Sequence, residues 1–153
     1  MTNSNSVSKF SQYAGNRLAL LVGIDSYPDI AIPDLRVCAG DVQAVHNALI
    51  SNGYNTEHVR LLLSPGVGAA PATRAEILAA LNSIAQTAEK DDLLLFYFSG
   101  HGIATRGGQA YLLPTDTRYA AVEDTVINLD RVKQIIQSSQ ARAKVLILQQ
   151  LSL

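Results

Sequence analysis

The stretch Asp91-Asp92-Leu93-Leu94-Leu95-Phe96-Tyr97-Phe98-Ser99-Gly100-His101-Gly102 decides the fold. Its apolar part does not alternate with polar residues, which is typical of a strand buried on both faces, and hence of a parallel sheet under helices. In such sheets chemistry sits in the loops that leave the carboxyl ends of the strands. We expect the strand to span Leu93 to Phe98 and the flanking glycines to let the backbone turn and a substrate approach. His101 would then stand at the rim of the sheet; alternatively, it is a turn histidine that bonds a neighbouring carbonyl.

The rest of the chain alternates strand-like and helix-like segments around this stretch. Apolar runs predict strands at 18–24, 59–63 and 144–148. Helical spacing predicts helices at 39–52, stopped by Gly53, at 73–85, opened by the capping pattern of Thr73 and Glu76, and at 129–136. Residues 64–72 and the tip 106–108 are expected to be loops. This order predicts an α/β fold, a three-layer α/β/α sandwich with a mainly parallel sheet.

Composition narrows the class of protein. The 153 residues are 48% hydrophobic, which fits one compact domain, and 12 basic against 13 acidic residues give a formal charge of -1. Nothing in that balance indicates a nucleic-acid or membrane surface, and the longest apolar runs are too short to span a bilayer. Residues 1–16 are expected to be a disordered tail, and 17–153 one domain. The single cysteine, Cys38, excludes an internal disulfide and suits a reducing compartment, so we expect a cytoplasmic protein.

Four segments in register resemble the caspase and metacaspase group of cysteine peptidases (peptidase family C14), specifically its large-subunit half. They are Leu20-Leu21-Val22-Gly23-Ile24-Asp25-Ser26-Tyr27, Leu35-Arg36-Val37-Cys38-Ala39-Gly40-Asp41-Val42, Phe96-Tyr97-Phe98-Ser99-Gly100-His101-Gly102 and Tyr111-Leu112-Leu113-Pro114-Thr115-Asp116. The resemblance covers residues 17–148. It implies a caspase-like fold and a cysteine-type endopeptidase, in which a thiolate attacks the peptide carbonyl while a histidine transfers the proton.

The resemblance assigns roles to three residues. His101 matches the catalytic histidine, the general base and acid, and Gly102 matches the residue whose backbone N–H helps to hold the oxyanion. Asp41 matches an acidic residue that lines the pocket for a basic side chain in metacaspases, which implies cleavage after Arg or Lys. The alternative for Asp41 is a carboxylate favoured in the first turn of a helix by the helix dipole.

The nucleophile is where the chain departs from the family. The strand 144–148 leads into Gln149-Gln150-Leu151-Ser152-Leu153, where the family has Asp-Ala-Cys-His-Ser-Gly, so Leu151 occupies the cysteine position. Cys38 lies near the start of the first helix, away from that strand, and is read as a small buried apolar residue. Ser152 has no evident activating geometry. We therefore expect the chain as written to be inactive by the family's route.

The resemblance also bears on partners and cofactors. We expect the domain to be truncated after its fourth strand and to lack the C-terminal part of the sheet, which leaves 144–148 at an open edge. A partner chain or a homodimer is expected to cover that edge. A peptide or protein is the expected substrate or ligand, and a non-catalytic pseudo-peptidase interaction module is the alternative function. No cofactor is required; calcium remains open by resemblance, with no site identified.

Other polar residues are given structural interpretations. His46 and His58 are read as surface or packing residues, Asp91 and Asp92 lie at the wrong end of the sheet for catalysis, and Arg106 is a solvated charge or, alternatively, a processing site. Loop carboxylates at 25 and 29 are expected to form turns, and those at 116 and 124 fix no ion site. A flavodoxin-like domain is a weaker alternative, because Gly23-Ile24-Asp25-Ser26 lacks the glycine pattern that cradles phosphate.

Overall fold

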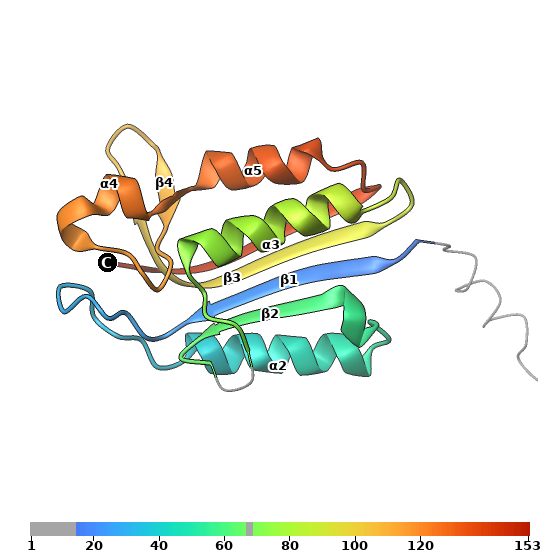
Figure 1. Cartoon of the computed structure of the whole chain (residues 1–153), viewed down its shortest axis with the longest axis horizontal. Coiled ribbons are helices and arrows are strands. Elements are labelled where there is room, and N and C mark those ends of the chain that lie inside the picture. The colour runs from blue at the N-terminus through green and yellow to red at the C-terminus, as the bar shows by residue number, and fades with distance from the viewer. Residues whose placement is uncertain (1–14, 67–68) are drawn as a thin grey trace, which may run out of the picture.

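A computed structural model describes residues 15–66 and 69–153. The predicted tail at 1–16 falls almost wholly outside these residues, as do Val67 and Gly68 of the predicted loop. Three long parallel pairings organise the sheet: β1 (Arg17–Ile24) lies between β2 (Val59–Ser64) and β3 (Leu93–Ala104), and β6 (Ala143–Ser152) pairs with the other side of β3. Figure 1 shows these strands running side by side through the centre of the molecule.

Helices cover both faces of this sheet, so the predicted three-layer architecture is confirmed. One face packs against α2 (Cys38–Ser51), and the opposite face against α3 (Arg74–Thr87) and α5 (Leu129–Ser138) (Figure 1). Alternate residues of each strand point to opposite faces. Thus Leu20, Val22, Phe96 and Phe98 belong to the larger core with α3 and α5, whereas Ala19, Leu21 and Leu95 belong to the smaller core with α2.

The central strand differs from the prediction at its carboxyl end. β3 does not stop at Phe98 but continues through Gly100, His101 and Gly102 to Ala104. The two glycines make no sharp turn, since among the described residues only Gly53 and Gly108 have positive φ. The prediction was wrong because pairing on both sides of β3 outweighs the low strand propensity of glycine.

The antiparallel part of the sheet follows His101. A hairpin at the predicted tip leads from β3 into β4 (Ala110–Leu112), and β4 pairs with β5 (Ile127–Asn128). Gly108, with φ of +84°, supplies the left-handed residue that this tight turn requires. The sheet is therefore mixed: its long pairings are parallel, as predicted, and its short ones antiparallel. Three short helical segments complete the described elements, η1 (Thr56–His58), η2 (Tyr119–Ala121) and α4 (Val122–Thr125).

Caps fix where the helices begin and end. The Thr73 hydroxyl accepts a hydrogen bond from the Glu76 N–H at 3.2 Å, as the capping pattern predicts for α3. At α2 the residue at the N-cap, Val37, provides no side-chain bond, and Asp25 from the loop after β1 provides it instead. Its carboxylate accepts from the N–H groups of Cys38 at 2.8 Å and Ala39 at 3.2 Å. The helix dipole favours a carboxylate at this place.

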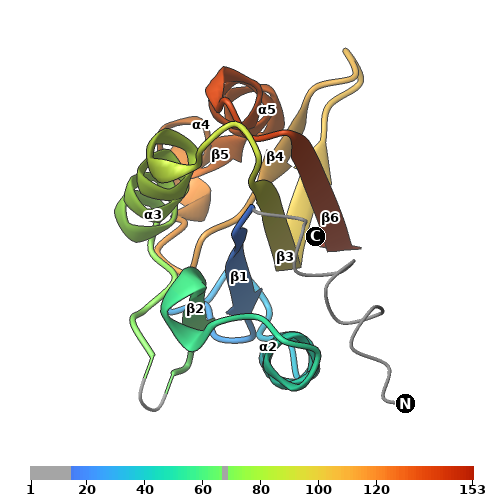
Figure 2. The same ribbon diagram turned by 90° about the vertical axis from the view of Figure 1, so that its right-hand side faces the viewer.

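β6 forms the open edge of the sheet. It is longer than the predicted 144–148, and within the described part of the chain it pairs with β3 alone. Figure 2 shows it as the outermost strand on its side. Its apolar side chains remain in contact with solvent, with Val145 40% exposed, Ile147 43% and Leu151 40%. Among residues 15–66 and 69–153 we find no helix of the length and apolarity that a membrane span requires.

Candidate active site

His101 is held in place by groups from two parts of the chain, the loop after β1 and the strand β6. Its ring is buried, with 3% of the residue exposed. The ring nitrogen Nε2 lies 2.7 Å from the carbonyl oxygen of Pro33, in the loop after β1, and Nδ1 lies 3.2 Å from the carbonyl oxygen of Leu151, in β6. The backbone N–H donates to the Tyr27 hydroxyl at 3.0 Å. The histidine is therefore fixed at both its backbone and its ring.

The two carbonyl oxygens lie at different distances from the two ring nitrogens. A neutral imidazole carries one N–H and donates one such bond, so the two contacts differ in kind. The shorter contact, to Pro33, is the better place for that proton. Nδ1 then presents its lone pair toward the end of β6. Nδ1 is then the ring nitrogen that lies nearer to residue 151.

Residue 151 lies directly beside His101. In the parallel register of β3 and β6, His101 pairs with Leu151 and Gly102 with Ser152. Register partners of neighbouring strands point to the same face of a sheet. The structure thus brings His101, Gly102 and Leu151 together, while Cys38 sits on α2. Leu151 has no side-chain atom that ionises or accepts a proton.

The glycines on either side of His101 provide space. A Cβ at Gly100 would lie 3.0 Å from the Tyr27 hydroxyl oxygen and 3.1 Å from the Phe98 ring. A Cβ at Gly102 would lie 2.7 Å from the side-chain oxygen of Gln150. The missing Cβ at each position therefore lets a neighbouring side chain lie close to the strand. The glycines do not make the sharp turn that the sequence suggested.

Asp41 reaches the same end of β6 from the first turn of α2. Its carboxylate is exposed and accepts a long hydrogen bond, 3.5 Å, from the side-chain amide of Gln149. The amide oxygen of Gln149 accepts a bond of 2.7 Å from the Tyr97 hydroxyl. Burial raises the pKa of this hydroxyl above its ordinary value, and Asp41 and Cys38 act in the same direction. Asp41 and His101 therefore contact the same short segment, residues 149–151.

Comparison with known proteins identifies the family. The sequence model of the caspase domain matches residues 16–151. The chain belongs to the caspase domain family. It is 40% identical over 96 residues to a metacaspase-1 of Eremothecium gossypii, an alignment that covers 61% of this chain and 21% of the relative. It is 31% identical over 137 residues to a metacaspase-1 of Mycosarcoma maydis, which covers 83% of this chain and 34% of the relative.

A solved structure has the same fold. The crystal structure of a Geobacter sulfurreducens protein superposes with a TM-score of 0.66 at 17% sequence identity, covering 90% of this chain and 50% of that one. The caspase domain described here thus spans half of that structure and 21% to 34% of the two metacaspases. The predicted resemblance and fold class are both confirmed.

Cys38 carries the single thiol of this caspase domain. The residue is 1% exposed, and burial raises the pKa of its thiol. The Ser99 hydroxyl acts in the opposite direction, and the Asp25 and Asp41 carboxylates each add a smaller effect that raises the pKa. That hydroxyl is buried beside the thiol yet forms no hydrogen bond of good geometry. The thiol is therefore protonated and shielded, as expected for a packing residue.

The remaining predicted residues have structural partners. The Asp29 carboxylate accepts from the N–H groups of Ala31 at 3.0 Å and Tyr119 at 2.8 Å; these bonds, then the Arg118 charge, lower its pKa. Asp116 accepts from the N–H of Arg74 at 2.9 Å, at the start of α3. His46 lies on the exposed side of α2. In the described part of the caspase domain, no three His, Cys, Asp or Glu side chains gather as a metal site would require.

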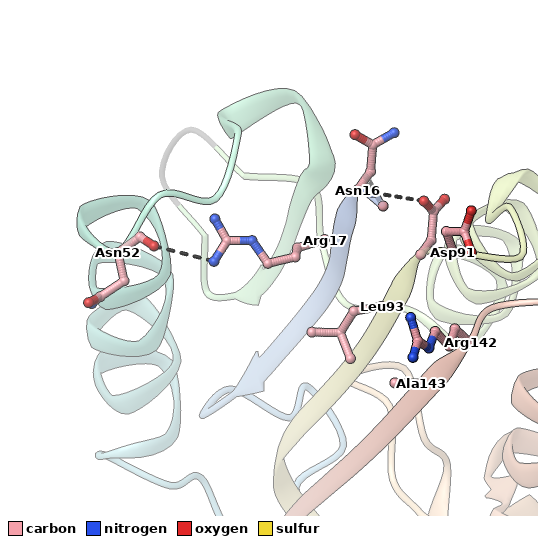
Figure 3. Close-up of a pocket in the computed structure, with 9 residues that line it drawn as sticks. Asn16, Arg17, Asn52, Asp91, Leu93, Arg142 and Ala143 are labelled. Atoms are coloured by element: carbon pink, nitrogen blue, oxygen red, sulfur yellow. Dashed lines mark hydrogen bonds between the residues drawn. The ribbon is translucent and has the colours of Figure 1, made fainter. Parts of the chain in front are cut away.

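A pocket of about 690 Å³ lies at the opposite end of the sheet (Figure 3). It is lined by Gly15, Asn16, Arg17, Asn52, Asp91, Asp92, Leu93, Arg142 and Ala143, at the amino ends of β1, β3 and β6. The Asp92 carboxylate is already occupied, because it accepts from the N–H groups of Asn16 and Glu89, each at 2.8 Å. The pocket is thus remote from His101. Its buried carboxylate, that of Asp92, holds neighbouring backbone segments together.

Sequence reasoning missed Tyr27, Pro33 and Gln149. The first two reach His101 across 74 and 68 residues of chain, and Pro33 acts through its backbone carbonyl, which carries no sequence signal. Tyr27 stands in one of the segments that resemble the family, and its place there was the available signal. Gln149 stands two residues before Leu151, at the position where the family has aspartate. This difference from the family was the available signal for Gln149.

Proposed function

We propose that this caspase domain is organised for peptide-bond hydrolysis after arginine or lysine, and that the chain with leucine at position 151 does not carry out that reaction itself. The observation that carries the proposal is the ring of His101, held at Nε2 by Pro33 and facing the end of β6 with Nδ1. A cysteine at position 151 would lie beside a positioned base, which is the requirement for an activated thiol nucleophile.

The other proposed roles follow from the same end of the sheet. Nδ1 of His101 would accept the thiol proton and later protonate the leaving amine. The backbone N–H of Gly102 is proposed as an oxyanion donor. The exposed carboxylate of Asp41, close to Gln149, is proposed to attract the basic side chain of the substrate. The Gln149 amide at 3.5 Å is neutral, so the charge of Asp41 is not neutralised by that contact.

The test introduces the missing thiol by Leu151→Cys. A thiol that transfers its proton to His101 has a lowered pKa and is alkylated by iodoacetamide below neutral pH. We expect its alkylation at pH 6.5 to be about tenfold faster than in the double variant Leu151→Cys, His101→Ala, a change measured by mass spectrometry. Cys38 is the internal control, because a buried thiol of raised pKa reacts slowly in both variants. Equal rates in the two variants would refute the role of His101.

Specificity is tested with the same variant. Peptidyl chloromethyl ketones that end in arginine, lysine or norleucine label the thiol introduced at position 151 after binding of their terminal side chain. We expect the arginine and lysine reagents to react faster than the norleucine reagent, and Asp41→Asn to remove that difference. Unmodified chain incubated with Arg and Lys peptide substrates is expected to release no product. Product release by the unmodified chain contradicts the proposed inactivity.

A non-catalytic interaction module is the second candidate, favoured by the side chain at position 151. Leu151 is 40% exposed and lies on the same edge strand as Val145 and Ile147. We propose that a strand of another polypeptide pairs with β6, since an apolar edge readily accepts one. We propose a second copy of this chain as the partner. If the two β6 strands pair antiparallel with Leu148 at the centre, Val145 of one copy lies opposite Leu151 of the other, and no like charges lie opposite each other.

Sedimentation of the chain tests this edge. We expect the wild-type chain to sediment as a dimer and Ile147→Lys to sediment as a monomer, because a lysine on an edge strand disfavours pairing. Lys133→Ala, at an exposed position of α5, is the control and should not change the assembly. A monomeric wild-type chain would exclude the second copy as the occupant. The cytoplasm remains the proposed compartment, on the ground that a single buried thiol suits reducing conditions.

A further inference from the structure

We propose that Tyr27 is a positioning residue for His101: its hydroxyl is inserted between β3 and the end of β4 and sets the place of the histidine backbone. The proposal rests on the proposed function, because it gives Tyr27 a task only if His101 is the base. Tyr27 stands in the loop after β1, and 4% of it is exposed. The hydrogen bonds of its hydroxyl go to the backbone of His101 and of Leu113, which follows β4.

The hydrogen bonds show how the hydroxyl is inserted. In an antiparallel pair, two opposite residues exchange two direct N–H to carbonyl bonds. Leu113 donates its N–H to the His101 carbonyl at 3.0 Å, which is one of these bonds. In place of the other, the His101 N–H donates to the Tyr27 hydroxyl at 3.0 Å, and that hydroxyl donates to the Leu113 carbonyl at 3.0 Å. The phenol bridges the gap that a direct bond would close.

Two further features fit this arrangement. Gly100 leaves the space, since a Cβ there would lie 3.0 Å from the hydroxyl oxygen. Burial also raises the pKa of Tyr27 far above its ordinary value of 10.0, so the phenol keeps its proton. A protonated phenol both donates and accepts a hydrogen bond, and the bridge needs both. A phenolate could not donate to Leu113.

The same loop also holds the ring of the histidine. Pro33 accepts from Nε2, and the Tyr27 ring stands 5.0 Å from the imidazole, centroid to centroid, with the planes at 55°. The Tyr27 N–H donates to the Asp34 carboxylate at 2.8 Å, which ties the loop to itself. Tyr27 thus fixes the backbone from which the imidazole reaches both carbonyl oxygens. Removing the hydroxyl leaves the His101 N–H without its acceptor, and the resulting movement of the backbone redirects Nδ1.

The experiment compares Tyr27→Phe with Tyr97→Phe in the chain as it exists. Both remove one phenol hydroxyl near β3, but that of Tyr97 bonds the exposed Gln149 side chain. Nitrogen-15 NMR reports the tautomer and hydrogen bonding of each imidazole, and His46 and His58 are internal references. For Tyr27→Phe we expect the His101 ring nitrogens to shift and its amide to exchange at least about tenfold faster, because the amide loses its acceptor. Tyr97→Phe is expected to leave both unchanged.

Gly100→Ala provides a second variant should Tyr27→Phe not fold, because it retains the phenol and displaces its hydroxyl. We expect the same change at the His101 ring, with the references unmoved. Ring shifts and amide exchange of His101 that match wild type in the folded variants would overturn the proposal. These readouts need no catalysis, so a failure of this assignment is distinguished from a failure of the thiol experiments at position 151, which would refute the proposed function.

Discussion

Replacement of Asp92 by alanine tests how the amino ends of the strands are held together. The residue is 4% exposed, and its two carboxylate oxygens accept separate backbone bonds, from Asn16 before β1 and from Glu89 after α3. The Asp92 carbonyl also accepts the Arg142 N–H at 2.9 Å, just before β6. One residue therefore joins the chain at the starts of β1, β3 and β6.

The magnitude follows from the two bonds. A hydrogen bond to a charged group contributes about 1.5–3 kcal/mol, and an amide left without a partner loses all of it unless water replaces the carboxylate. The pocket near Asn16 is open to water, which can replace part of the bond made there. We therefore count that bond at half and expect Asp92→Ala to cost about 2–4.5 kcal/mol. With a urea slope of about 2 kcal/mol per molar, the unfolding midpoint falls by about 1–2 M.

The neighbouring carboxylate serves as the matched control. Asp91 precedes the same strand, lines the same pocket and is exposed. Asp91→Ala removes an equal charge and should shift the midpoint by less than about 0.3 M, since exposed substitutions stay within about 0.5 kcal/mol. Urea unfolding followed by circular dichroism measures both. If Asp92→Ala unfolds at the same midpoint as Asp91→Ala, the carboxylate does not organise the strands.

Three further predictions concern caps, pH and glycines. Thr73→Ala removes the hydroxyl that caps α3 and should lower the unfolding free energy by about 1 kcal/mol in urea, whereas Thr73→Ser should retain most of it. Because burial raises the pKa of Cys38 and Tyr27 above their ordinary 9.0 and 10.0, their stabilisation is complete below these values and is lost as pH rises past them. Unfolding free energy measured from about pH 8 to 11 should therefore fall, and less steeply in Cys38→Ala; a flat profile would contradict this. Gly100→Ala should lower the melting temperature more than Gly102→Ala, since its Cβ meets a fixed phenol and a buried ring rather than a flexible glutamine; the reverse order would be inconsistent with the packing.

Much of the fold could be predicted because its signals are local. Unbroken apolar runs predicted the parallel strands, helical spacing predicted α2, α3 and α5, and the hydroxyl of Thr73 caps where its pattern predicts. Gly53 ends α2 with φ of +96°, which is what its position predicted. Each of these features depends on neighbours within a few residues. The family followed from four short segments, each of which is recognised from its own consecutive residues.

The candidate site could be predicted only in part, because its contacts are distant in sequence. His101 was found from its place after an apolar run, yet the groups that hold it lie 74 and 68 residues earlier. Neither a tyrosine hydroxyl nor a proline carbonyl indicates by itself which strand it will meet. The continuation of β3 through Gly100 and Gly102 was missed for the same reason. It depends on pairing with β6 and β4, which overrides local propensity.

The loop between β1 and α2 explains why the site is built as one unit. Asp25 caps the helix that carries Asp41, while Tyr27 and Pro33 hold the backbone and the ring of His101. The predicted substrate residue and the predicted base are therefore positioned by the same short segment, although they belong to different elements. A shift of that loop moves both, because Asp25, Tyr27 and Pro33 all belong to it.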